Sequence, residues 1–78
     1  MNTIASQWAS FEHSVVPANA SEIQRIEMKR SFYAGAGAML SLMTGTIAKQ
    51  SEAAGVQMVK GLHQECRTFA LDVEEGRA

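Results

Sequence analysis

Residues 21–43, SEIQRIEMKRSFYAGAGAMLSLM, decide the fold, because their pattern predicts one long helix with two different apolar faces. Ser21 and Gln24 have the spacing of a capping box, in which side chains bind backbone groups that the first helical turn leaves without partners. Pro17 lies upstream of this start, where it cannot break the helix. The pattern predicts a helix over about residues 20–45.

The two faces of this helix differ in the size of their side chains. The bulky stripe consists of Met28, Phe32, Ala36, Met39 and Met43, and Tyr33, Leu40 and Ile47 extend it. The small stripe consists of Ala34, Ala38, Ser41 and Gly45, with Gly37 beside them. A glycine inside a helix costs about 1 kcal/mol relative to alanine. Gly35 and Gly37 therefore indicate either a close crossing by a second helix or ligand, or a tolerated weak point in a well-packed helix.

A shorter helix is predicted over about residues 3–15, with Asn2 or Thr3 as its cap. Its apolar side chains recur at helical spacing and are Ile4, Trp8, Phe11 and Val15. An isolated helix of about a dozen residues is marginal in water, so this helix must dock on another element. Trp8 is the expected anchor on the long helix, and the alternative role for its ring is to stack on a base.

A third helix is predicted over about residues 51–75, with Ser51 as its cap and residues 46–50 as a loop before it. A heptad-like seam with the spacing 3, 4, 3, 4 follows this helix. The seam consists of Val59, Leu62, Cys66, Phe69 and Val73. Acidic side chains near residue 75 oppose the helix dipole, so we expect that end to fray.

These patterns together predict an all-α fold in a single domain, residues 1–78. A short amino-terminal helix would fold against an antiparallel pair of long helices, with the bulky stripe on the seam. A chain of this size usually needs a disulfide, a metal or a partner chain for stability. Cys66 is the only cysteine, which excludes an intrachain disulfide. We therefore expect a homo-oligomeric helical bundle, in which the small stripe contacts another subunit.

Composition excludes several classes of function. The net charge is −1 and the pI is near 6.1, whereas DNA- or RNA-binding domains carry clustered positive charge. No apolar run approaches the roughly 18 residues that span a membrane. The amino-terminal residues do not have the pattern of a signal peptide. We expect a cytoplasmic protein without a membrane partner.

The residues of catalytic and metal sites do not form a recognisable set. His63 and Cys66 are three residues apart on one helix, but a zinc site needs further ligands, for which His13 and Glu65 are the candidates. A buried core thiol beside a surface imidazole is the preferred interpretation. The AGAG run at residues 34–37 lies inside a helix, so it is not a dinucleotide-binding loop. We expect no enzyme activity, no metal and no cofactor.

Two cationic lines are the strongest candidates for a binding site. On the long helix the line consists of Arg25, Lys29 and Arg30, with Tyr33 beside them. On the last helix it consists of Lys60, His63 and Arg67. Arginine and lysine next to apolar and aromatic side chains suit an anionic ligand with an aromatic part. The alternative is two solvated faces, with surface pairs between Glu22 and Arg25 and between Glu27 and Arg30.

The segments VVPANASEIQRIEMKRSFYAGA and LHQECRTF resemble small helical proteins of bacteriophages and prophages. The resemblance covers most of the chain and rests on Trp8, Phe11, Pro17, Gln24, Glu27, Arg30, Phe32, Tyr33, Gly35, Leu62, Glu65 and Phe69. It implies a phage origin, hence the cytoplasm of a bacterial host, and carries no activity with it. Phage proteins this small commonly act by stoichiometric binding.

The leading functional hypothesis is a phage-type binding protein that sequesters a nucleotide second messenger of host immunity, such as a cyclic nucleotide or an ADP-ribose derivative. The six residues of the two cationic lines, together with Tyr33, would form its site. The alternative hypothesis is an inhibitor or adaptor that binds a host protein through an exposed helix face. Only the first hypothesis predicts that nucleotides stabilise the protein.

Overall fold

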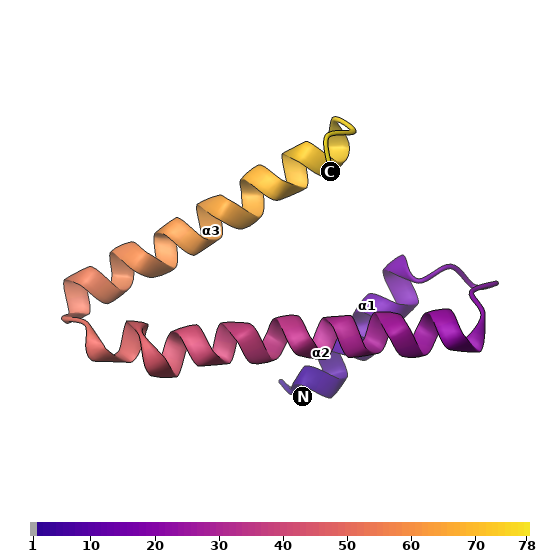
Figure 1. Cartoon of the computed structure of the whole chain (residues 1–78), viewed down its shortest axis with the longest axis horizontal. Coiled ribbons are helices and arrows are strands. Elements are labelled where there is room, and N and C mark those ends of the chain that lie inside the picture. Colours follow the sequence, from indigo (N-terminus) through magenta and orange to yellow (C-terminus); the bar gives the residue numbers. More distant parts are fainter. Residues whose placement is uncertain (1) are drawn as a thin grey trace. The chain divides into compact units, whose positions relative to one another are not determined.

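The computed structural model describes residues 2–78, and over these residues it is all-helical, without strands (Figure 1). Helix α1 spans Ile4–Val15, α2 spans Glu22–Gly45 and α3 spans Glu52–Glu74. A 3₁₀ turn, η1, spans Ile47–Lys49 within the segment predicted as a loop. The predicted all-α class with three helices is confirmed. None of the described helices is both long and apolar enough to cross a membrane.

A hydroxyl side chain caps the amino-terminal end of each of the three α-helices. The Thr3 hydroxyl accepts from the Ser6 N–H at 3.0 Å, and the Ser6 hydroxyl accepts from the Thr3 N–H at 3.1 Å, which closes a capping box. Ser21 accepts from the Gln24 N–H at 3.0 Å. Ser51 accepts from the Ala54 N–H at 3.2 Å. The caps predicted at Ser21 and Ser51 are confirmed, and Thr3 rather than Asn2 caps the first helix.

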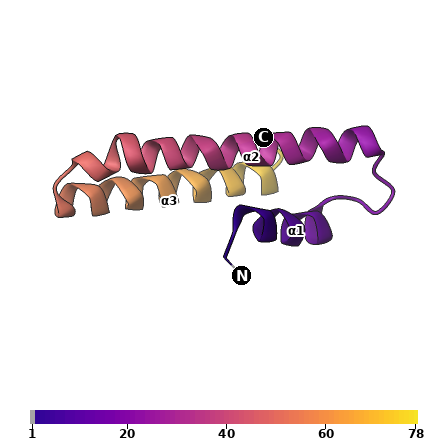
Figure 2. The same ribbon diagram turned by 90° about the horizontal axis from the view of Figure 1, so that it is seen from below.

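The chain divides into two compact units, one ending at Leu40 and the other beginning at Ser41. In the first unit α1 packs on the amino-terminal half of α2 (Figure 2). Trp8 is 6% exposed and contacts Phe32, with 5.5 Å between the ring centroids. Phe11 completes the cluster, with its centroid 5.3 Å from that of Phe32. Trp8 thus anchors α1 on the long helix, as the sequence predicts.

The second unit contains the end of α2, η1 and α3. Ile47 of η1 lies over Gly55 in the first turn of α3, and a Cβ atom at Gly55 would be 3.6 Å from the Ile47 Cγ2. That distance is an ordinary van der Waals contact, and the glycine itself is buried. The contact fixes the turn between the two long helices onto the start of α3.

The carboxyl end of α3 is closed by a hydrogen-bonded motif, so the predicted fraying is wrong. Gly76 adopts a φ of 78°, and its N–H donates to the Val73 carbonyl at 3.1 Å. The Arg77 N–H donates to the Asp72 carbonyl at 2.7 Å. These two bonds are those of a Schellman motif. The Arg77 guanidinium also pairs with the Asp72 carboxylate at 2.8 Å and with that of Glu75, which neutralises the acidic helix end.

Candidate functional site

Arg25, predicted to bind a ligand, contacts the protein's own backbone. Its Nη2 donates to the carbonyl oxygens of Pro17 and Ala18, at 3.0 and 3.1 Å. Its Nη1 lies 3.6 Å from the Glu12 carboxylate of α1. The guanidinium therefore ties α1 and the connecting loop to α2. This contact replaces the surface pair between Glu22 and Arg25 that the sequence offered.

Lys29, Arg30 and Tyr33 lie on the exposed surface of α2. Within residues 2–78, the ion pairs involve only Arg25 and Arg77 as cations, so the sequence-based pair of Glu27 with Arg30 is not formed. The Tyr33 side chain is 38% exposed, and its ring stands edge-on to that of Phe32, with centroids 6.3 Å apart. Two free cations and a phenol ring are thus accessible on one helix.

The second cationic line lies along α3. Lys60, His63 and Arg67 are all exposed, at positions that repeat along one side of the helix. The helix α3 thus presents a cationic face of its own within the second unit.

The thiol of Cys66 is exposed, so its predicted burial is wrong. The prediction failed because it assumed that the seam of α3 is a packed core, whereas the neighbouring seam residue Phe69 is 56% exposed. In the part of the chain that the structure describes, no three His, Cys, Asp or Glu side chains come together in a group that could hold a metal ion.

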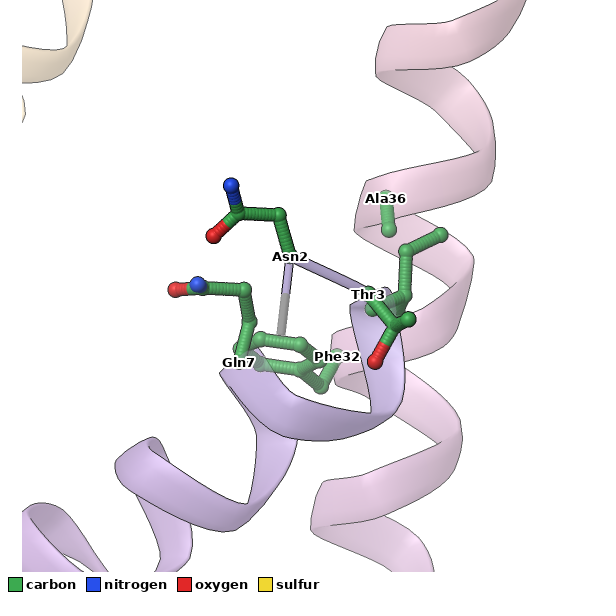
Figure 3. Close-up of a pocket in the computed structure, with 6 residues that line it drawn as sticks. Asn2, Thr3, Gln7, Phe32 and Ala36 are labelled. Atoms are coloured by element: carbon green, nitrogen blue, oxygen red, sulfur yellow. The ribbon is translucent and has the colours of Figure 1, made fainter.

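An open depression of about 490 Å³ lies where the first turn of α1 meets α2, and the sequence did not reveal it. It is lined by Asn2, Thr3, Ile4, Gln7, Phe32 and Ala36. Figure 3 shows Phe32 and Ala36 on α2 and the carboxamides of Asn2 and Gln7 directed away from that helix. The lining contains no charged side chain, so its chemistry differs from that of the cationic lines.

A second apolar face of α2 is exposed, and it differs from both of the stripes predicted from the sequence. Tyr33 and Leu40 were predicted to extend the bulky stripe, whose member Phe32 faces α1. Both residues are instead exposed, and so are Ile23 and Ile26, the former to 73%. These four side chains are 3, 7 and 7 residues apart, which fits the heptad-like repeat that identified the seam of α3. This repeat is the signal in the sequence that identifies the second face of the long helix.

No known protein family, curated protein or solved structure gives a significant match to this chain.

Proposed function

We propose that this chain is a non-enzymatic binding protein that acts by stoichiometric contact with another protein through an exposed helix face, within a small homo-oligomeric assembly. The observation that carries the proposal is the distribution of apolar side chains. Among the hydrophobic side chains of residues 2–78, only Trp8 and Val16 are buried. Large exposed apolar patches on a protein surface mark sites of interaction, and small domains often need a second chain for stability.

The contact face for the partner is the seam of α3. Val59, Phe69 and Val73 are exposed there together with Cys66. An amphipathic helix with a repeating apolar line is a common way to bind a groove or a helix of another protein. The resemblance to phage proteins supports a protein of the bacterial host as the partner.

Antiparallel pairing of α2 with α3 remains part of the proposal. A short connection between two helices favours antiparallel neighbours, and only η1 and its flanking residues separate them. Phe32, in the middle of the bulky stripe, already contacts α1. Met39 and Met43, both exposed, are therefore the stripe residues that we assign to contact with α3, beside its seam and not on it, so that the seam stays free for the partner.

A pull-down from bacterial lysate tests the partner face. The bait proteins are the natural chain, Phe69→Asp in the seam, and Leu71→Asp outside it. Phe69 is 56% exposed and Leu71 is 53% exposed. The two variants therefore change side chains of nearly equal exposure, and only Phe69 lies in the seam. We expect the natural chain and Leu71→Asp to capture the same protein and Phe69→Asp to lose it. Equal capture by all three, or capture of nothing specific, would contradict this function.

A second candidate function is sequestration of an anionic small molecule, and the exposed cations of α2 favour it. Lys29 and Arg30 form no ion pair within residues 2–78, and the Tyr33 ring lies beside them. Such a set can bind a phosphate and stack on a base. A thermal-shift screen with cyclic nucleotides and ADP-ribose derivatives tests this candidate. A stabilising ligand should lose its effect on Arg30→Ala and keep it on the matched variant Lys49→Ala.

A further inference from the structure

One face of α2 has the spacing of a helix-pairing seam and lies apart from the face that α1 covers. The α2 seam, as we name it, consists of Ile23, Ile26, Arg30, Tyr33, Gly37 and Leu40. Intervals of 3 and 4 residues alternate along it, which is the pattern of residues that face a second helix. Its four large apolar side chains are all exposed. A Cβ atom at Gly37 would have nothing within 4 Å.

We propose that the α2 seam binds the α2 seam of a second copy of this chain, antiparallel, about a two-fold axis between residues 31 and 32. The proposal deepens the self-association proposed above, on which it rests, by assigning the surface and the orientation. A two-fold interface must be self-complementary. In this register Ile23 meets the partner's Leu40, Ile26 meets the partner's Gly37, and Arg30 meets the partner's Tyr33.

The pairs in this register complement one another in size and chemistry. Ile26 faces a glycine, so the two helices approach closely there without a clash. Arg30 lies over the partner's Tyr33 ring, where a guanidinium and a phenol attract one another. The two-fold axis repeats each pair, so the interface holds two such cation and ring contacts at its centre.

The charges next to the seam select the antiparallel orientation. In the antiparallel register Lys29 faces the partner's Ala36, and Glu27 faces the partner's Ala34, so no like charges meet. A parallel pairing would place Arg30 directly against the partner's Arg30, and Glu22 against the partner's Glu27. Like charges at such positions repel. The second copy therefore fits one orientation only.

Disulfide trapping of single-cysteine chains tests the surface and the orientation together. The background is Cys66→Ser, which removes the native thiol. Ile26→Cys and Gly37→Cys are prepared as separate chains, then mixed and oxidised. Residues 26 and 37 are about 16 Å apart along one helix, which exceeds the reach of a disulfide. A bond between the two positions must therefore join two chains.

We expect the mixture to form a covalent dimer that contains one chain of each kind, while neither chain alone forms one. The matched control is a mixture of Gln24→Cys and Ala38→Cys. In the proposed register these two positions also lie at nearly the same height on the two helices, but both are outside the seam, so no crosslink should form. Covalent dimers from either seam variant alone would show a parallel pair and overturn the proposal. Equal trapping of the control mixture would overturn it as well.

The mass of the natural chain in solution separates the failure of this proposal from the failure of the proposed function. An oligomer without disulfide trapping at residues 26 and 37 would place the contact elsewhere and leave self-association intact. A single chain at all concentrations would refute both the α2-seam interface and the homo-oligomeric assembly of the proposed function.

A variant without a new cysteine gives an independent measurement. Ile26→Asp should raise the dissociation constant of the dimer about tenfold or more, because it buries a charge, while Leu42→Asp, outside the seam, should leave it nearly unchanged.

Discussion

The ring of Trp8 meets the ring of Phe32 edge-on, with 5.5 Å between their centroids and an angle of 62° between their planes. Aromatic rings favour this geometry, because the positive edge of one faces the negative face of the other. The contact joins α1 to α2 and is made by Trp8, one of the two hydrophobic side chains that are buried in the described residues. The packing of the first unit thus depends on one aromatic cluster.

Replacing Trp8 with alanine should release α1 from α2. Removal of a buried tryptophan typically lowers the free energy of unfolding by about 3 to 5 kcal/mol. We expect a lower midpoint of thermal unfolding and less helix by circular dichroism. Val15→Ala is the control, since Val15 lies on the same helix but is 56% exposed, and its effect should stay within about 0.5 kcal/mol. Equal effects of the two variants would refute the anchoring role of Trp8.

Replacing Arg25 with lysine should lower the stability although the positive charge is kept. Arg25 donates to the carbonyls of Pro17 and Ala18, and the lysine ammonium cannot reproduce the planar fork of the guanidinium. We expect a loss of about 1 kcal/mol in chemical unfolding. Arg67→Lys, on the exposed surface of α3, should leave the stability unchanged. A ligand-binding role without a structural one predicts the natural stability for Arg25→Lys.

Replacing Gly76 with alanine should destabilise the end of α3. A φ of 78° is strained for any residue with a Cβ atom, and we expect a cost of about 1 kcal/mol. Gly61→Ala has the opposite expectation. Gly61 lies inside α3, its Cβ position is open, and alanine there should stabilise the helix by about 1 kcal/mol. Urea unfolding measures both changes, and the same sign for both would contradict the role of the Schellman motif.

The helices and their caps could be predicted because each depends on residues that are close together in the sequence. Ser21 and Ser51 have the side chains that cap a helix, and Trp8 lies on a clear helical stripe. The closed end of α3 was missed for a different reason. The acidic side chains near residue 75 predict fraying when they are considered alone, but Gly76 and Arg77 fold back over the last turn and bind its carbonyl groups.

The candidate site was less predictable, because it depends on which groups the folded chain uses for itself. Arg25 looked like its cationic neighbours in the sequence, yet the loop carbonyls and Glu12 engage it. The apolar seam of α3 predicts a buried Cys66, but a periodic pattern identifies a contact face without showing that anything covers it, and the thiol is exposed. The exposure of Lys29 and Arg30 likewise follows from the fold and leaves their role as ligand-binding residues a prediction.

The mass of the natural chain in solution, measured by sedimentation over a range of concentrations, tests the central claim most directly. The claim is that the exposed apolar faces of the long helices exist to contact other chains, beginning with a second copy. It predicts a mass that is a multiple of the 8.4 kDa of one chain, and dissociation when Ile26 is replaced by aspartate. A mass of 8.4 kDa at every concentration would contradict the claim.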